Sequence, residues 1–365
     1  MIDTQGHESG LAEDPGASLS RRSAGWLVAV FCGIVVAALM GLVHLPYAIL
    51  KPGPVTNTLG NGPGGKPLIT VEGESTYPTS GALDFTTVSV FGGPDNPINV
   101  WDWFTGQLDP TNSIVPQEEL FPKGVTSTQV DRESAAEMAD SQQEAIAVAL
   151  RGMGQTVPEV VTIKEVTKGS PASGVLRPGD VLVSIDGKEV TTPDGVRAAV
   201  RAHEAGDTAV FKVRRAGKEQ VLSVKTAESE GHTVVGVLLK AAFDFPIKVS
   251  INAGEVGGPS AGMMFSLAVY DKLTPGALTG GAKIAGTGTI DSAGKVGPIG
   301  GIHQKLEGAR RGGATWFLAP AGNCAEVVGH VPDGLKVAKV ATFTEARDAV
   351  EAIAAKKTAS LPTCK

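Results

Sequence analysis

A serine at a glycine-rich corner is the residue of this sequence best placed for covalent chemistry. It lies in the run Gly-Gly-Pro-Ser-Ala-Gly over residues 257–262, which begins an apolar helix. Gly258 can adopt the strained backbone that leads into this helix, Pro259 suits its first turn, and Ser260 then lies where free N–H groups point outward. These groups could stabilise the oxyanion that forms when a serine attacks an amide. The pattern indicates a nucleophile, which still needs a base.

A lysine is the candidate base. No histidine near Ser260 in sequence has an obvious carboxylate partner, which disfavours a Ser-His-Asp triad. Lys305 begins a second expected helix, and its apolar neighbours imply partial burial: Ile299, Ile302, Leu306 and Ala309. Burial favours the neutral amine, which can take the proton of a serine. His303 lies two residues before Lys305 and would point away on a helix, so we do not expect it to be the base.

The two segments together resemble the proteolytic domain of Lon proteases, which are Ser-Lys peptidases. The serine motif of that family reads here as Gly-Pro-Ser-Ala-Gly over residues 258–262. The lysine segment reads as Thr-Gly-Thr-Ile at 287–290, Gly-Lys-Val at 294–296 and Pro-Ile-Gly-Gly at 298–301, followed by Lys305 without a gap. The resemblance covers roughly residues 230–355.

The resemblance implies a role for each of these residues. Ser260 would be the nucleophile, Lys305 the general base and Thr287 a hydroxyl near the lysine amine, with Gly258 and Pro259 supporting the serine. It also leaves a homo-oligomer open. The alternative for Ser260 taken alone is a serine that caps a helix.

Two features depart from the family's pattern. Many Lon proteases carry an acidic residue three positions before the serine, where this chain has Gly257, with Glu255 two residues earlier. No Gly-x-x-x-x-Gly-Lys-Ser/Thr phosphate loop occurs, and residues 61–67 lack its spacing and hydroxyl. We therefore expect a peptidase without the ATP-driven unfolding motor and without that acidic residue to control its resting site.

The composition excludes several other classes of function. The 365 residues are 42% hydrophobic and 19% charged, which describes a globular protein with one more apolar part. The net charge of -6 and the lack of long basic clusters argue against nucleic-acid binding. No Cys-x-x-Cys or His/Cys ligand spacing suggests a metal, and we expect no cofactor.

An uncharged segment near the N-terminus predicts a transmembrane helix at 25–45. Residues 25–43 carry no charge, and at about 1.5 Å per residue they nearly span a hydrocarbon core of about 30 Å. The alternative is a cleaved signal peptide, but its apolar region would be only about 7–15 residues long, and no clear Ala-x-Ala site follows. Arg21 and Arg22 precede the segment, so the positive-inside rule puts a disordered tail, residues 1–24, in the cytoplasm. We expect a single-pass protein of the bacterial plasma membrane, with everything after residue 50 outside the cytoplasm.

The segment 46–127 is expected to be a linker and a membrane-proximal β region. Residues 51–65 are rich in Pro, Gly and Asn, which is typical of a linker that leaves the membrane. Strands are expected at 68–71 and 83–90. Trp101, Trp103 and Phe104 are expected to pack in a core or near the membrane rather than to form a ligand cage.

The segment 128–228 is expected to contain a helix, at about 129–150, and a small β-rich domain. Gly-Ser-Pro-Ala at 169–172, Leu-Arg-Pro-Gly-Asp at 176–180 and Ile-Asp-Gly at 185–187 resemble the PDZ domains of bacterial proteases. The resemblance implies that a peptide C-terminus or an extended segment binds by adding to a sheet edge. The alternative is a groove that has lost its ligand and only packs on the protease.

The predicted architecture is therefore an α+β multidomain protein with a single transmembrane helix, a PDZ-like β-rich domain and a Lon-type α/β proteolytic domain at 229–355. A tail at 356–365 follows. We expect Ser260 and Lys305 to hydrolyse peptide bonds of flexible or unfolded proteins. The alternatives are a tethered peptide-binding adaptor with an inactive Lon-like domain, and a regulatory protease with a few membrane-protein targets.

Two cysteines predict a disulfide. If residues after 50 face an oxidising compartment, Cys324 and Cys364 are the two thiols there, and a bond between them would tie the tail onto the catalytic domain. The alternative is two unpaired thiols.

Overall fold

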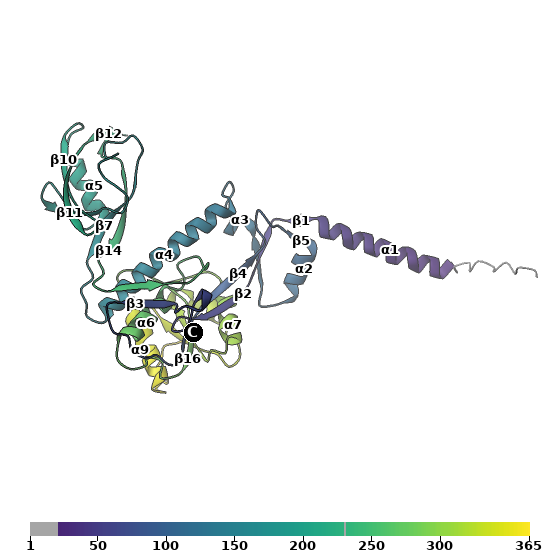
Figure 1. Cartoon of the computed structure of the whole chain (residues 1–365). Helices are drawn as coiled ribbons and strands as arrows, with labels where there is room; N and C mark the ends of the chain where they lie inside the picture. The colour runs from purple at the N-terminus through teal and green to yellow at the C-terminus, as the bar shows by residue number, and fades with distance from the viewer. Residues whose placement is uncertain (1–20, 230) are drawn as a thin grey trace, which may run out of the picture. The chain divides into compact units, whose positions relative to one another are not determined.

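The computed structural model describes residues 21–229 and 231–365 (Figure 1). The chain divides into two compact units. The first unit holds the described residues up to 49 and residues 91–122, and the second holds 50–90 with the described residues from 123 onward. Most of the tail predicted over residues 1–24 lies outside the described residues. Each unit is described by itself below.

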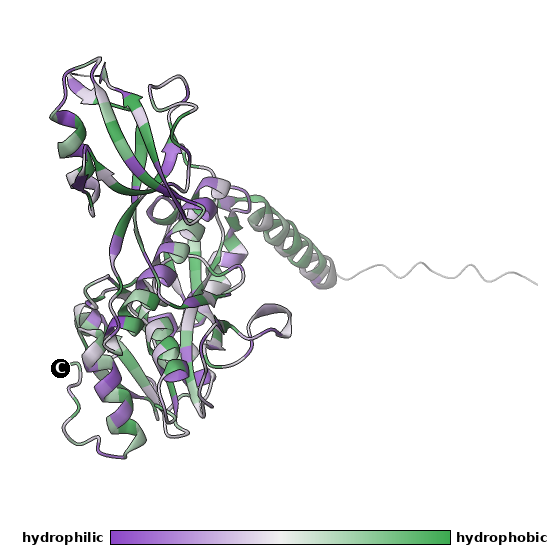
Figure 2. Ribbon diagram, turned by 60° about the vertical axis from the view of Figure 1, so that its left-hand side comes forward, coloured by the Kyte–Doolittle hydropathy of each residue, from purple (hydrophilic) through white to green (hydrophobic). Residues whose placement is uncertain are grey.

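A long apolar helix begins the first unit. Helix α1 (Arg21–Leu42) contains the window Gly25–Leu42, whose mean hydropathy is 2.4 and of which no residue is buried. Figure 2 shows it as an almost uniformly hydrophobic rod. By length and composition it could cross a membrane. The remaining elements of this unit are β1 (His44–Leu45), β5 (Ile98–Asn99), α2 (Val100–Leu108), β6 (Ser113–Pro116) and α3 (Gln117–Leu120).

The proteolytic part of the second unit is built on a mainly parallel sheet. Its strands run in the order β20-β19-β16-β4-β2, and the pairs β20–β19, β19–β16 and β16–β4 are parallel. The strands are β2 (Tyr47–Asn57), β4 (Ala82–Phe91), β16 (Lys283–Gly286), β19 (Trp316–Pro320) and β20 (Lys336–Val340). Two further pairs are β3 (Ile69–Glu72) with β15 (Lys248–Ile251), and β17 (Thr289–Ile290) with β18 (Val296–Gly297).

Helices cover both faces of this sheet, so its strands carry apolar residues on both sides. On β16, Ile284 belongs to one hydrophobic cluster and Ala285 to another. The first cluster includes buried residues of α4 (Ser127–Gly152), α6 (Gly262–Leu273) and α9 (Phe343–Ala354), and the second those of α7 (Ile302–Arg311) and α8 (Cys324–Val327). This three-layer arrangement is the expected α/β proteolytic domain.

The structure corrects the interpretation of residues 51–57, which are part of an eleven-residue strand rather than a linker. Pro52 and Pro54 lack N–H groups, but residues two apart direct these groups to the same edge, so the opposite edge can still pair. Gly53 permits close packing, because a Cβ there would lie 2.4 Å from Thr87 Oγ1. The Pro and Gly content of this segment thus led to the wrong prediction, and β2 is a strand of the sheet.

The PDZ-like domain has its own sheet and its own core. The strand order is β11-β10-β8-β7-β14, and a separate cluster of buried residues includes Phe211 and Val213. The elements are β7 (Glu159–Val166), β8 (Val181–Ile185), β9 (Lys188–Glu189), α5 (Pro193–Arg201), β10 (Thr208–Arg215), β11 (Lys218–Lys225), β12 (Ala227–Ser229), β13 (His232–Val234) and β14 (Val237–Phe243). The buried apolar side chains of α4 belong instead to the cluster shared with α6.

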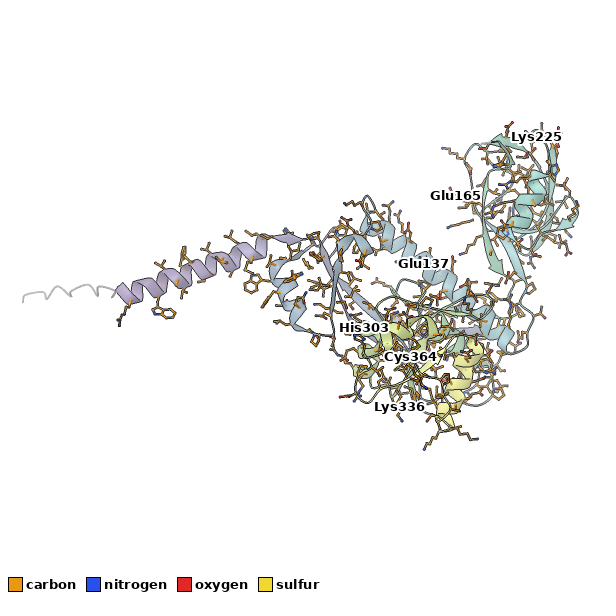
Figure 3. All side chains as sticks on the ribbon, turned by 180° about the vertical axis from the view of Figure 1, so that it is seen from behind. Glu137, Glu165, Lys225, His303, Lys336 and Cys364 are labelled. Atoms are coloured by element: carbon orange, nitrogen blue, oxygen red, sulfur yellow. A yellow bond between two sulfur atoms is a disulfide. The ribbon has the colours of Figure 1, made fainter. Side chains whose placement is uncertain are left out.

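The predicted disulfide is confirmed. Cys324 and Cys364 are bonded, with 4.9 Å between their Cα atoms. Cys364 is labelled in Figure 3. Pro362 O also accepts a hydrogen bond from Lys339 N, so the tail lies against β20. The C-terminal segment is thus fixed at two points.

Candidate active site

The loop between β15 and α6 presents the serine. Gly258 has φ of +80°, a backbone conformation that glycine adopts without strain. Helix α6 begins at Gly262 with Ala261 as its cap, so Pro259 precedes the helix and does not lie in its first turn as the sequence analysis expected. Ser260 is half-buried, two residues before the first helical residue.

Helix α4 holds this loop from the side. Gly258 N donates to Ser134 O at 2.8 Å, and Ser141 Oγ donates to Pro259 O at 2.9 Å. Gly262 lets the two helices approach, because a Cβ there would lie 2.6 Å from Ser141 Oγ. These two hydrogen bonds fix the backbone just before Ser260.

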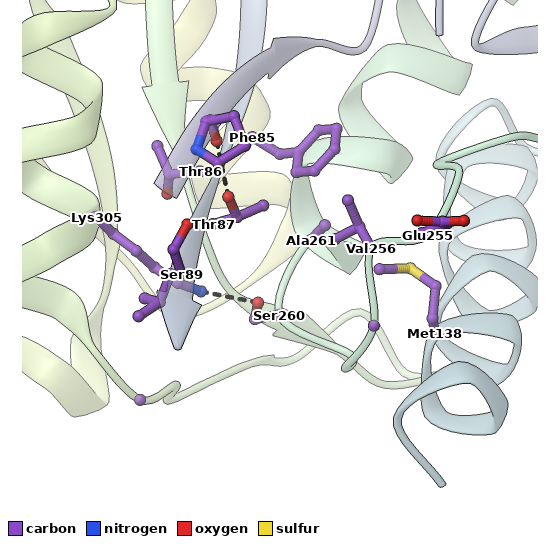
Figure 4. Close-up of a pocket in the computed structure, with 14 residues that line it drawn as sticks. Phe85, Thr86, Thr87, Ser89, Met138, Glu255, Val256, Ser260, Ala261 and Lys305 are labelled. Atoms are coloured by element: carbon purple, nitrogen blue, oxygen red, sulfur yellow. Dashed lines mark hydrogen bonds between the residues drawn. The ribbon is translucent and has the colours of Figure 1, made fainter. Parts of the chain in front are cut away.

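The lysine helix starts against β4. Gly301, the cap of α7, has φ of +69°, and a Cβ on it would lie 2.6 Å from Val88 Cγ2. One turn further on, Lys305 Nζ donates to Ser260 Oγ at 2.8 Å (Figure 4). It also donates to Thr287 Oγ1 at 3.0 Å. The structure therefore brings the three predicted polar residues within hydrogen-bonding distance of one another.

The lysine amine is almost completely buried. Lys305 is 3% exposed, and this burial lowers the pKa of its amine from 10.5 to about 8. At pH 7 such an amine is neutral in about one molecule in ten, whereas an amine with the ordinary pKa is neutral in about one in 3,000. Burial thus raises the fraction of neutral amine at pH 7 well above that of an exposed lysine.

Thr287 connects the lysine to the backbone of the serine. It follows β16 directly and is fully buried. Its Oγ1 donates to Ser260 O at 2.9 Å, and Gly288 N donates to the same oxygen at 2.8 Å. Ser260 is therefore positioned from a strand of the sheet as well as from α4.

A cleft of about 420 Å³ opens in front of the pair. Its lining comes from five separate segments: Pro54, Phe85, Thr86, Thr87, Val88, Ser89, Met138, Glu255, Val256, Gly257, Ser260, Ala261, Gly300 and Lys305. In Figure 4, Lys305 approaches Ser260 from one side, and Met138 and Val256 lie on the other. The N–H groups of Ser260 and Ala261, which line this cleft, donate to no acceptor within the described ranges.

The sequence analysis missed the contribution of β4 to the cleft. It expected a strand at 83–90 without assigning it to the site, but residues 82–86 are all buried and residues 85–89 line the cleft. The sequence did contain a signal. Residues 82–86 carry one charge, Asp84, and their other side chains can be buried on both faces, which is typical of a central parallel strand.

The departure at position 257 has a steric reason. A Cβ at Gly257 would lie 2.8 Å from Ser134 Cβ on α4, so an acidic side chain does not fit there without movement. Glu255 is exposed and lines the cleft. Among the residues that line the cleft, the acidic one is thus exposed to solvent.

His303 does not contact the serine, as expected. Its Nε2 lies 2.8 Å from Glu326 O, and its ring stacks on that of His330 at 3.7 Å between centroids. In the described part of the chain, no group of three or more His, Cys, Asp or Glu side chains could hold a metal ion.

Two consecutive segments of the chain match known domain families. Residues 124–226 match the PDZ domain family, and residues 230–356 match the Lon protease (S16) C-terminal proteolytic domain. The first match begins before α4, so it includes a helix that packs on α6.

Individual proteins show the same likeness. The chain is 32% identical over 133 residues to the Lon protease of Azospirillum brasilense, which is 35% of this chain and 16% of that protein. It is 38% identical over 94 residues to Lon protease 1 of Bacillus subtilis, which is 26% of this chain and 12% of that protein. The chain thus spans less than a fifth of either relative. The solved PDZ domain of an SdrC-like protein from Listeria innocua is 26% identical, with 22% of this chain and 92% of that chain covered and a TM-score of 0.21.

Proposed function

Because residues 230–356 form a Lon-type serine peptidase domain and residues 124–226 include a PDZ domain, we propose that this chain is a membrane-anchored endopeptidase that needs no ATP. One observation supports the chemistry above all others. A buried lysine amine lies 2.8 Å from the hydroxyl of a serine in a cleft. In amide hydrolysis the first step uses the same contact in the opposite direction, because the serine hydroxyl gives its proton to the neutral amine.

Ser260 and Lys305 divide the reaction between them. Neutral Lys305 takes the proton from Ser260 Oγ as that oxygen attacks the peptide carbonyl, and then returns it to the leaving amine. Water hydrolyses the acyl-enzyme with Lys305 again as base. The N–H groups of Ser260 and Ala261 are the donors available to the oxyanion. Thr287, which accepts from the amine, keeps Nζ directed toward the serine.

The cleft favours an extended substrate with an apolar side chain at the cut. Strand β4 pairs with β16 only over residues 82–85, and the residues beyond line the cleft. A substrate segment can lie along that part of β4. Phe85, Met138 and Val256 then offer an apolar surface beside Ser260. Unfolded or flexible segments satisfy this geometry, because a folded chain could not present an extended backbone.

The PDZ domain offers a second place for an extended peptide. Strand β14 is at one end of the sheet order, and α5 contacts it. A peptide that pairs with the free edge of β14 would lie next to α5. We propose that this groove retains the protein substrate while Ser260 cuts another part of it.

The anchor and the orientation are supported by sequence and composition. Helix α1 is long and apolar enough to span a bilayer, and Arg21 and Arg22 come before its apolar window. The positive-inside rule then places the catalytic domain outside the cytoplasm. External protease added to wall-stripped bacteria should degrade that domain, and protection until lysis would reverse the orientation.

Peptide hydrolysis by the purified full-length chain tests the function. Casein should be cut equally with and without ATP, and Ser260→Ala or Lys305→Ala should stop the reaction without changing thermal unfolding much. Lys305→Arg should fail too, because guanidinium does not give up its proton. Wild-type rates in either alanine variant would refute the assignment of nucleophile and base. A strict need for ATP would refute nucleotide independence.

A further inference from the structure

Helix α2 exposes an apolar stripe on one face. Trp101, Phe104 and Leu108 are 41%, 49% and 67% exposed, and their spacing puts them on the same side of the helix. Gly106 lies on the opposite side, where a Cβ would come within 2.9 Å of Ile49 Cδ1. The Gly106 side thus packs within this unit, whereas the opposite stripe stays at least 41% exposed although Trp101 contacts α1.

The polar groups near this stripe are already satisfied. Thr105 lies next to Trp101 on the helix surface, and its Oγ1 donates to Trp101 O at 2.9 Å. Asp102 is the one charged residue of α2, and its carboxylate accepts from Asn99 N at 3.0 Å in a capping box. Transfer of this face from water into an apolar environment would thus leave the Thr105 hydroxyl with a hydrogen-bond partner.

Helix α2 touches α1 inside the apolar window of α1. Trp101 Nε1 donates to Ala37 O at 2.9 Å. Among residues 25–42, all of them described, only Ala37, Met40 and Gly41 are partly buried, and they form one stripe. Ala37 lies five residues before Leu42, which is about 7–8 Å along a helix axis. If α1 spans a bilayer up to Leu42, the indole of Trp101 must lie at that depth.

We propose that α2 is an interfacial helix that inserts Trp101, Phe104 and Leu108 at the boundary between lipid headgroups and acyl chains. This inference rests on the proposed anchor, which it deepens by naming a second membrane contact. Interfacial helices bury their apolar face by about 5–10 Å, which agrees with the depth set by Ala37, and tryptophan prefers this zone. Because α2 has no Lys or Arg, its partner is the apolar boundary of any phospholipid rather than anionic headgroups.

Spin labels on the full-length protein test the proposal. A Cys32→Ala chain leaves the introduced cysteine as the labelling site, since Cys324 and Cys364 are bonded to each other. Nitroxides are placed one at a time by Phe104→Cys and Leu108→Cys, and the proteins are reconstituted in phosphatidylcholine vesicles. Collision with oxygen, which enters lipid, is compared with collision with a water-soluble nickel chelate.

Two control positions separate this inference from the anchor. Val35→Cys reports the middle of α1, and Glu119→Cys reports an exposed polar site on α3. We expect the ratio of oxygen to nickel collisions at 104 and 108 to exceed that at 119 severalfold, at low and high salt alike. A lipid-like ratio at 35 with an aqueous ratio at 104 and 108 would overturn the interfacial helix and leave the anchor standing.

The remaining outcomes also decide. An aqueous ratio at position 35 as well would overturn both the anchor and the interfacial helix. Low collision with both reagents at 104 and 108 would mean that protein covers the stripe, and a second copy of the chain would replace lipid as its partner.

Discussion

Replacing the buried lysine by methionine should abolish catalysis and change the pH dependence of folding. Methionine keeps the length and most of the volume of Lys305 but carries no proton. In the folded chain the pKa of Lys305 is lowered from 10.5 to about 8 because the amine is buried. Below pH 8 both the folded and the unfolded chain are protonated at this residue, so the folded state bears the full cost of a buried charge.

The magnitude follows from the two pKa values. Between pH 8 and 10.5 the unfolded chain holds a proton that the folded chain has lost, so wild-type stability rises with pH through this window. The full effect is about 3 kcal/mol, of which about 2 kcal/mol develops between pH 7 and pH 9.5. Lys305→Met lacks this contribution. Its stability relative to wild type should therefore fall by about 2 kcal/mol over the same range.

Urea unfolding of both proteins at a series of pH values measures this difference. Other titrating groups are common to the two chains and cancel. The lost hydrogen bonds to Ser260 and Thr287 add an offset that is nearly constant with pH. Lys295→Met makes the same change of residue type at an exposed position and is the matched control. If the difference in the free energy of unfolding between wild type and Lys305→Met does not change with pH, burial does not lower the pKa of this amine.

Four further outcomes are expected. The kcat/KM of the wild type should rise about tenfold per pH unit and level off above about pH 8, where Lys305 is neutral; a profile flat from pH 6 to 9 contradicts this role. Thr287→Val should lower kcat by about tenfold to a hundredfold with little change in KM, because the amine and the serine backbone lose a shared partner. Met138→Asp should lower kcat/KM for peptides with an apolar residue at the cut while Met138→Leu keeps it, and equal rates on all peptides would exclude this residue from the cleft's specificity. Cys364→Ser should reduce the free energy of unfolding by about 3–4 kcal/mol, as seen in denaturant, since it opens a loop with a sequence separation of 40.

The proximity of Ser260 and Lys305 was predictable because the segment that carries each residue has its own local signal. Gly258 leads into the serine loop with a positive φ, and Gly301 caps the lysine helix where Val88 leaves no room for a side chain. Such positions need glycine, so the sequence shows them. The depressed pKa of Lys305 was also foreseeable in direction, because apolar residues surround it on its helix.

The contacts that hold Ser260 and Lys305 in place were not predictable, because the residues that make them are distant in sequence from both. Ser141 reaches Pro259 across 118 residues, and nothing in the spacing of a polar helix indicates that contact. Strand β2 was hidden for another reason. Prolines and glycines dominate it, and their usual meaning is a turn, unless close packing such as that of Gly53 on Thr87 requires them.

These supports bear on where the catalytic domain begins. The family match starts at residue 230, yet the sheet that carries Thr287 includes β2 and β4, and the serine loop is fixed by α4. Leu83 and Phe85 of β4 share a core cluster with residues of α6. The polar contacts that order Ser260 join it or its neighbours to other elements, namely α4, the segment after β16, and α7. The PDZ domain is therefore inserted between two parts of one catalytic domain, and its edge strand β14 continues within a few residues into β15 and then the serine loop. A peptide bound at that edge, as proposed above, would therefore pair with the strand that leads along the chain to Ser260.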